Sequence, residues 1–137
     1  MKAKSGHIIF KKGTKYSDLL PVYKDLYLTF LEETQQIPEE PEQLSVLIHS
    51  NITDLKKNRK PEGYNRAGDV RLIFPIKEKS LEFYVYTTGK NSKVVKVTEK
   101  LSKILARHGL EHEVVWDRMI WKEREQSAPK PPAPQPP

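Results

Sequence analysis

The sequence predicts a small α+β domain, with a mixed or antiparallel sheet, a central hairpin and about three helices in a chain of 137 residues. Two neighbouring segments, 70–76 and 80–87, alternate apolar and polar residues as half-buried strands do. Three longer segments repeat apolar residues at the spacing of an amphipathic helix. The last nine residues contain six prolines, so we expect a disordered tail over 122–137. These observations place one domain at 13–121, between that tail and a basic N-terminal arm (1–12).

The first part of the chain predicts a short strand and a helix. Residues 7–10 are apolar enough for a strand, which Gly13 would end. A helix is expected from Ser17, as N-cap, to Thr34, with Pro21 in the first turn, where a missing N–H costs little. Its buried stripe would comprise Leu19, Tyr23, Leu26, Tyr27, Phe30 and Leu31.

A second helix is expected to follow the acidic connector 35–43. Pro41 would open it, because proline suits the first helical position. Its inner face would carry Leu44, Leu47, Ile48, Ile52 and Leu55. It would end in a basic loop, 56–69, that contains Pro61, Gly63 and Gly68.

The two strand-like segments are expected to form the hairpin. In the first, one face would hold Val70, Leu72, Phe74 and Ile76, and the other Arg71 and Ile73. Pro75 cannot donate to a ladder, so this strand should lie at an edge or end there. In the second, one face would hold Leu81, Phe83 and Val85, and the other Glu82, Tyr84 and Tyr86.

A third helix should begin after Gly89, with Asn91 or Ser92 as its cap, and stop at Gly109. Residues 111–121 would form the last strand, in which Trp116 and Trp121 suit either a core or a partner surface. The order strand, helix, helix, strand, strand, helix, strand is compatible with a ferredoxin-like unit (β-α-α-β-β-α-β) whose first crossover has two helices. Without the first strand, the fold would be a plainer α+β sandwich.

Composition narrows the function classes. The formal charge of +6 and the pI of about 9.4 favour an anionic partner. The absence of cysteine excludes disulfides and thiolate chemistry. No apolar run approaches the roughly 20 residues of a membrane span or forms a signal-peptide core, so we expect a cytoplasmic protein without a membrane partner. Neither a phosphate-binding loop nor a metal-ligand pattern is present, so no cofactor and no metal are expected.

The third helix is the sharpest candidate for a nucleic-acid contact. Its cations follow one another at spacings of 3, 4, 3 and 4, and therefore share one face: Lys93, Lys96, Lys100, Lys103 and Arg107. Glu99 is the only acid in the helix. A row of cations about 20 Å long matches a row of phosphates, and it equally suits a solvated helix face.

Two further features support the same hypothesis. The basic loop sets Lys56, Lys57, Arg59, Lys60 and Arg66 around Tyr64, and Arg71 follows it. Tyr84 and Tyr86 would stand about 7 Å apart on one sheet face, a spacing on which bases stack; alternatively, a helix covers them. We therefore expect a non-enzymatic module that binds RNA or single-stranded DNA through these basic surfaces and exposed tyrosines.

Residues 55–86 combine a basic loop, an aromatic-Asn-Arg sequence, a Gly-Asp, an Arg-Leu-Ile-aromatic strand and a hairpin. This stretch resembles the centre of RelE-type toxins, small basic ribonucleases that cut mRNA on the ribosome. The resemblance implies RNA contact or catalysis by Arg66, Arg71 and the neighbouring lysines. It defines the alternative function, a ribonuclease toxin.

The tail suggests a third class of function, protein interaction. PKPP, PPAP and PQPP each have the P-x-x-P spacing that aromatic grooves bind in a polyproline II helix. The tail would then be a ligand for a protein partner and the chain an adaptor; a passive spacer has the same composition.

Overall fold

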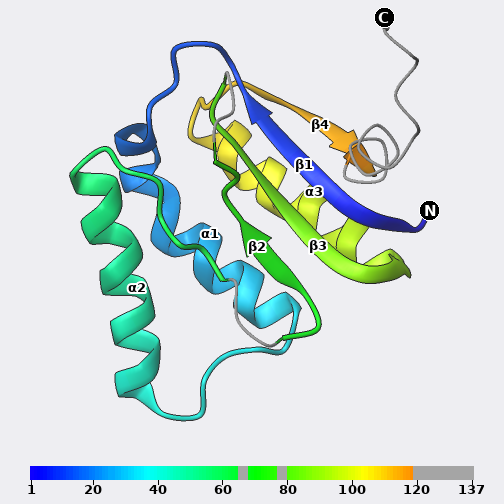
Figure 1. Cartoon of the computed structure of the whole chain (residues 1–137), viewed down its shortest axis with the longest axis horizontal. Coiled ribbons are helices and arrows are strands. Elements are labelled where there is room, and N and C mark those ends of the chain that lie inside the picture. Colours follow the sequence, from blue (N-terminus) through cyan, green and yellow to red (C-terminus); the bar gives the residue numbers. More distant parts are fainter. Residues whose placement is uncertain (65–67, 77–79, 119–137) are drawn as a thin grey trace, which may run out of the picture.

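The computed structural model describes residues 1–64, 68–76 and 80–118. Along the chain the elements are β1 (Ala3–Phe10), the 3₁₀ helix η1 (Tyr16–Leu19), α1 (Leu20–Glu33), α2 (Pro41–Lys56), β2 (Arg71–Ile73), β3 (Glu82–Asn91), α3 (Ser92–Arg107) and β4 (His112–Trp116) (Figure 1). The predicted turn at 77–79, part of the basic loop, Trp121 and the proline-rich tail lie outside the described residues.

The four strands form one sheet in the order β2-β3-β1-β4, and each neighbouring pair is antiparallel. This is the ferredoxin-like arrangement, with α1 and α2 together forming the first crossover and α3 the second. The predicted α+β class is therefore confirmed. In the part of the chain that the structure describes, no helix is long and apolar enough to cross a membrane.

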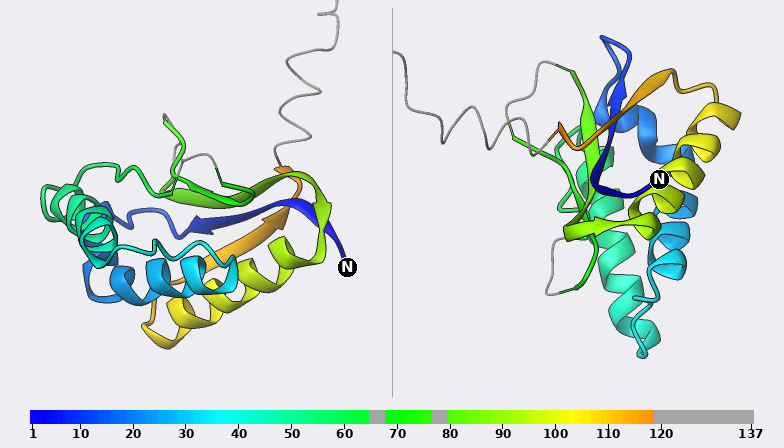
Figure 2. Two further views of the ribbon diagram at one scale, coloured as in Figure 1. Left: turned by 90° about the horizontal axis from the view of Figure 1, so that it is seen from below. Right: turned by 90° about the vertical axis from the view of Figure 1, so that its right-hand side faces the viewer.

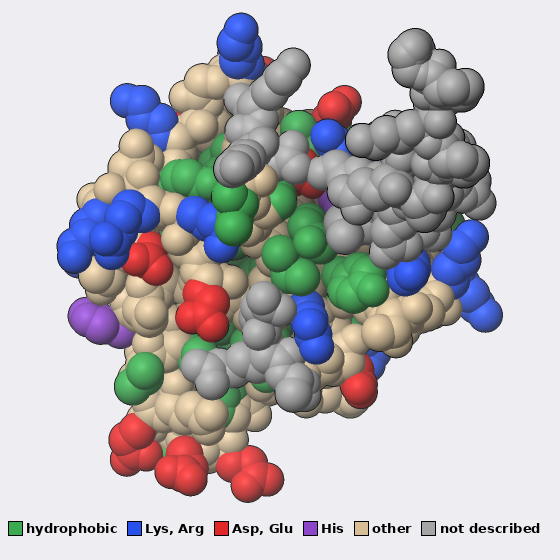
Figure 3. Space-filling view, in the orientation of Figure 1, with side chains coloured by type: hydrophobic (Ala, Val, Ile, Leu, Met, Phe, Trp, Pro, Cys, Tyr) green, Lys and Arg blue, Asp and Glu red, His purple; other side chains and the backbone are tan. Residues whose placement is uncertain are grey.

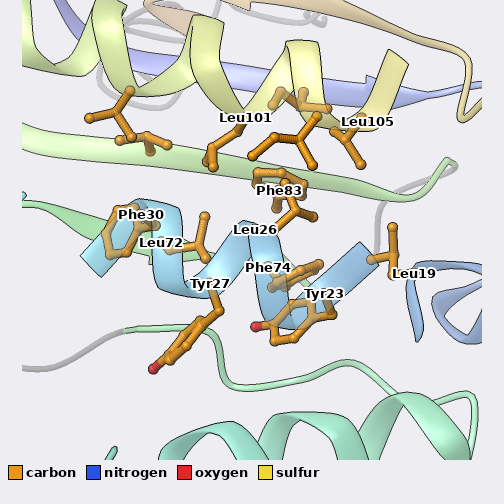
Figure 4. Packing of buried hydrophobic residues seen from close by; sticks show 14 of the residues in the cluster. Leu19, Tyr23, Leu26, Tyr27, Phe30, Leu72, Phe74, Phe83, Leu101 and Leu105 are labelled. Carbon is orange, nitrogen blue, oxygen red and sulfur yellow. The ribbon is translucent and has the colours of Figure 1, made fainter. Parts of the chain in front are cut away.

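Two layers enclose the core. Helices α1 and α3 lie side by side under one face of the sheet, and α2 packs outside them against α1 and η1 (Figure 2). The core joins residues of both layers, among them Leu26 of α1, Phe83 of β3 and Leu101 of α3 (Figure 4). Most of the predicted apolar stripes are buried, because their spacing matches the helices and strands that form.

The N-terminal residues differ most from the prediction. Residues 3–10, assigned to a basic arm with a strand only at 7–10, form the long strand β1, which is paired on both edges with β3 and β4. The sequence pattern did not predict a strand over all of 5–7, because Ser5, Gly6 and His7 are not apolar. Ser5 and His7 are nevertheless completely buried. The sheet therefore includes the chain from Ala3 onward.

The helix ends were predicted with mixed success. Pro41 opens α2, as expected. Asn91 caps α3, because its Oδ1 accepts hydrogen bonds from the N–H groups of Lys93 and Val94, and Gly109 follows the helix with a φ of 74°. Ser17 is not the cap of the first helix; it lies in η1, and α1 starts only at Leu20.

The hairpin strands have the predicted faces. β2 is an edge strand of three residues that ends before Pro75, as proline requires. Val70, Leu72 and Phe74 are buried, but Ile76 lies past the end of the strand and is 72% exposed, so it does not belong to the face predicted for it. In β3, Phe83 and Val85 face the helices.

Gly6 marks the place where α3 comes closest to the sheet. A Cβ built at residue 6 would overlap Thr98 Oγ1 and would lie 2.8 Å from Thr98 Cβ, a separation that real Cβ atoms do not show. Thr98 is itself fully buried, so it has little room to move. Only glycine therefore allows α3 to pack on β1 at this distance.

We expect Gly6→Ala to destabilise the protein by about 1–3 kcal/mol, the usual cost of overpacking a core. Denaturant unfolding measures the change. Gly89→Ala is the matched control, because a Cβ at residue 89 meets no atom within 4 Å. Equal stability of the two variants would contradict the close approach.

Tyr23 lies in the core with its hydroxyl unsatisfied. Its ring is stacked on the ring of Tyr27, with the two centroids 5.7 Å apart. Its hydroxyl has no hydrogen-bonding partner among the described residues. Burial raises the pKa of Tyr23 well above its usual value, and the nearby Tyr27 and Asp54 raise it further. The unfolded chain therefore loses this proton at about pH 10 while the folded protein keeps it, so stability present below that pH is lost as the pH rises beyond it.

We expect Tyr23→Phe to leave the free energy of unfolding at pH 7 unchanged or to raise it by about 1 kcal/mol, because an unpaired buried hydroxyl is removed. The variant should also lose less stability than the parent above about pH 10. Tyr27→Phe is the control with the same atom deleted: the Tyr27 hydroxyl donates to the Gly63 carbonyl at 3.2 Å, so its loss should destabilise. Thermal melts from pH 7 to 11 compare them, and a destabilised Tyr23→Phe would refute the argument.

Candidate nucleic-acid interface

All five predicted cations of α3 are exposed in one row: Lys93, Lys96, Lys100, Lys103 and Arg107. The row faces solvent because the opposite side of the helix, which includes Val94, Leu101 and Leu105, is buried against the sheet and α1. Lys100 Nζ lies 2.9 Å from Glu33 Oε2 of α1. The predicted row therefore exists, with a second neighbouring acid that comes from another helix.

The first part of the basic loop, residues 56–64, is held at both of its ends. Lys56, Lys57, Arg59 and Lys60 are exposed, and Arg59 pairs with Asp54 at 3.0 Å. At the far end, Gly63 N–H donates to Oδ1 of the buried Asn51 at 2.8 Å. Asn51 was not among the predicted site residues, although a polar residue on the apolar face of a predicted helix is a signal for such a contact. Arg66 lies outside the described residues.

Tyr64 was predicted to be a contact residue, but it belongs to the core boundary. Its ring packs against Tyr27 and Phe30, with centroids 6.4 and 5.8 Å away. Its backbone exchanges two hydrogen bonds with Leu72 of β2. Tyr64 therefore fastens the end of the loop to the sheet.

The two basic surfaces are separated in space. Helix α2, which leads into the loop, packs against α1 and η1, whereas α3 packs against β1, β3 and the other side of α1. Figure 1 shows α2 at one side of the molecule and α3 behind the sheet. They do not flank the tyrosines as a single surface, because α1 lies between them.

Tyr84 and Tyr86 lie on the sheet face opposite α1 and α3, the face seen in Figure 3. Tyr84 is only 8% exposed, and its ring is stacked on His7 with centroids 4.7 Å apart. The prediction of an exposed Tyr84 is therefore wrong, and so is the alternative that one of these two helices covers it. Tyr86 is half-buried; Arg71 is its cross-strand partner, and Lys4 Nζ lies 6.0 Å from its ring centre.

A network of buried and partly buried polar groups lies at the same sheet face. His7 Nδ1 lies 2.7 Å from Glu82 Oε2, and His7 Nε2 lies 2.9 Å from Ser5 Oγ. The other Glu82 oxygen, Oε1, lies 3.6 Å from Arg118 Nη1. Asp117 Oδ1 accepts hydrogen bonds from the backbone N–H groups of Lys4 and Ser5. This polar network links β1, β3 and the residues after β4.

The order serine, histidine, carboxylate is that of a hydrolytic triad. Ser5 and His7 are both completely buried, however, so no substrate reaches Ser5 Oγ in this structure. We therefore assign this polar network a structural role: each group satisfies the hydrogen bonding of a buried neighbour. The sequence did not predict this role, because alternation along the strand placed Glu82 on the face expected to meet solvent.

No group of three or more potential ligands among the described residues could hold a metal ion. His112, one of the two histidines near Gly109, instead contacts Ser102 Oγ at 2.6 Å and the Leu110 carbonyl at 2.7 Å.

The chain matches no family model, no curated protein and no solved structure. The resemblance of residues 55–86 to RelE-type toxins therefore stays a prediction.

We expect Glu82→Gln to destabilise the protein by about 1–3 kcal/mol, because it removes the charge that faces His7 and Arg118 in a buried site. Glu113→Gln is the control, since Glu113 also lies in the sheet but is exposed, and its change should stay within about 0.5 kcal/mol. Denaturant unfolding compares the two, and equal losses of stability would refute the structural role.

Proposed function

We propose that the protein binds nucleic acid, RNA or single-stranded DNA, through the phosphate backbone, with α3 as the principal contact. The observation that carries the proposal is the row of five exposed cations from Lys93 to Arg107. Fourteen rises of 1.5 Å separate these two residues, so the row is about 20 Å long and spans several phosphates.

The buried position of Tyr84 changes the expected mode of binding. A base cannot stack on Tyr84, because the side chain is only 8% exposed and one face of its ring is stacked on His7 at a centroid distance of 4.7 Å. Phosphate contacts position a strand but carry little sequence information. Binding should therefore depend strongly on salt and weakly on sequence.

Tyr86 and Arg71 form a smaller second surface on the opposite side of the sheet from α3. Since α3 packs under the other face, a short oligonucleotide cannot contact both surfaces at once. Variants of the two surfaces therefore have separable effects.

We expect the fourfold variant K93Q/K96Q/K103Q/R107Q to weaken binding of a labelled single-stranded oligonucleotide by at least tenfold. It should also lower the slope of log Kd against log salt by roughly 3, because each of the four lost phosphate contacts contributes about 0.7 to that slope. Fluorescence anisotropy at several salt concentrations measures both quantities. Lys100 is kept, because its ion pair with Glu33 joins α3 to α1.

The matched control is K56Q/K57Q/R59Q/K60Q, which removes the same number of charges from the loop at the other side of α1. Binding should fall much less in this variant. A greater loss in the loop variant would move the contact away from α3, and no binding of the parent protein at low salt would end the proposal.

A further inference from the structure

Strand β4 lies at the edge of the sheet, with one of its backbone edges unpaired among the described residues. The N–H of Lys11 donates to the Glu111 carbonyl, and the N–H of Asp117 donates to the Ser5 carbonyl. Backbone direction alternates along an antiparallel strand, so Glu113 and Val115 also point toward β1. His112, Val114 and Trp116 therefore direct their N–H and C=O groups outward, where an added strand would meet them.

A groove runs along this edge, between β4 and α3. One hollow of about 560 Å³ is lined by Ala106, Gly109, Leu110, Glu111 and His112. A second, of about 410 Å³, is lined by Glu99, Ser102, Lys103, Val114 and Trp116. The Ser102–His112 contact at 2.6 Å joins their linings, so the hollows adjoin along the strand.

The groove combines an apolar floor with a basic rim. Val114 and Trp116 pack partly against the core and stay partly exposed. On the α3 side, Lys103 lines the groove, and Arg107 lies one turn further along the same exposed helix face. Glu99 is the only acid on that side of the groove. Glu111, which lines its other end, is paired with Lys11 at 3.1 Å. Apolar side chains and carboxylates are the groups that such a groove complements.

We propose that this groove binds an extended acidic segment of a partner protein, which adds to β4 as a fifth strand. The backbone of the segment would pair with His112, Val114 and Trp116. Alternate side chains would enter the groove, with apolar ones over Val114 and Trp116 and a carboxylate at Lys103 or Arg107. This site is distinct in kind from the proposed nucleic-acid contact, although both use the last turns of α3.

Charge disfavours a second copy of this chain as the occupant. Pairing β4 with β4 of another molecule would bring together two copies of α3, each with five exposed cations. Like charges at an interface cost free energy, whereas an acidic segment gains it. The rim therefore favours the acidic segment over self-association.

The test begins with a displayed library of random dodecapeptides panned against the full-length chain. We expect the enriched peptides to alternate apolar residues and to carry acids. The strongest peptide is then synthesised, labelled and measured by fluorescence anisotropy. Lys103→Glu should weaken its binding at least tenfold, whereas Lys24→Glu, the same charge change at an exposed site on α1, should leave the Kd within about twofold.

Strand addition is tested in the peptide itself, without altering the protein. Two versions are N-methylated, each at one of the two alternating sets of amides. Only methylation of the amides that face β4 should abolish binding, because an added strand makes its hydrogen bonds to β4 along one edge. Val114→Pro removes an outward N–H without removing a bond to β1, and it should abolish peptide binding while oligonucleotide binding persists.

Three results would overturn the proposal. They are a library without enriched peptides, equal binding of both methylated peptides, and a dimer in light scattering that Val114→Pro converts to monomer. The last result would identify a second copy as the occupant. Thermal melts of each variant verify that it is folded.

Discussion

Helix α3 rests on β1 at Gly6, and the positions of most functional candidates depend on that contact. Thr98 lies so close to Gly6 that no side chain fits between them. Because β1 is paired on both edges, the contact also sets α3 relative to β3 and β4. With its buried side determined in this way, α3 presents its cations to solvent, and the groove forms between its outer side and β4.

The polar network stabilises β1 from its other face. His7 on β1 contacts Ser5 of the same strand and Glu82 on β3. Arg118 reaches Glu82 from beyond β4. Ser5, His7 and Glu82 are buried, and each would cost free energy if it were unpaired, so their contacts favour one register of β1 against β3. This arrangement also accounts for Tyr84, whose ring stacks on His7 and completes the buried layer.

The surface chemistry is divided between separate elements. The acidic residues Glu39, Glu40 and Glu42 gather at the start of α2 (Figure 3), and the basic loop follows the other end of that helix. The row on α3 lies across α1 from both. The cations of α3 are therefore separated both from the acidic start of α2 and from the basic loop. In contrast, the last turns of α3 border β4, where a phosphate chain and an acidic segment would compete.

The sequence by itself determined the class of fold, the starts of α2 and α3 and the cationic row, because proline, an Asn cap, glycine and helical spacing act within a few residues. Only the tertiary structure decided the burial of Ser5, His7 and Glu82, which their polarity argued against. The tertiary structure also decided the burial of Tyr64 and Tyr84. The alternation of side chains along the strand assigned Tyr84 to the correct face, but its exposure depends on residues distant in sequence, such as His7. The edge groove likewise exists only where β4 and α3 meet, since local pattern contains no information on which elements become neighbours.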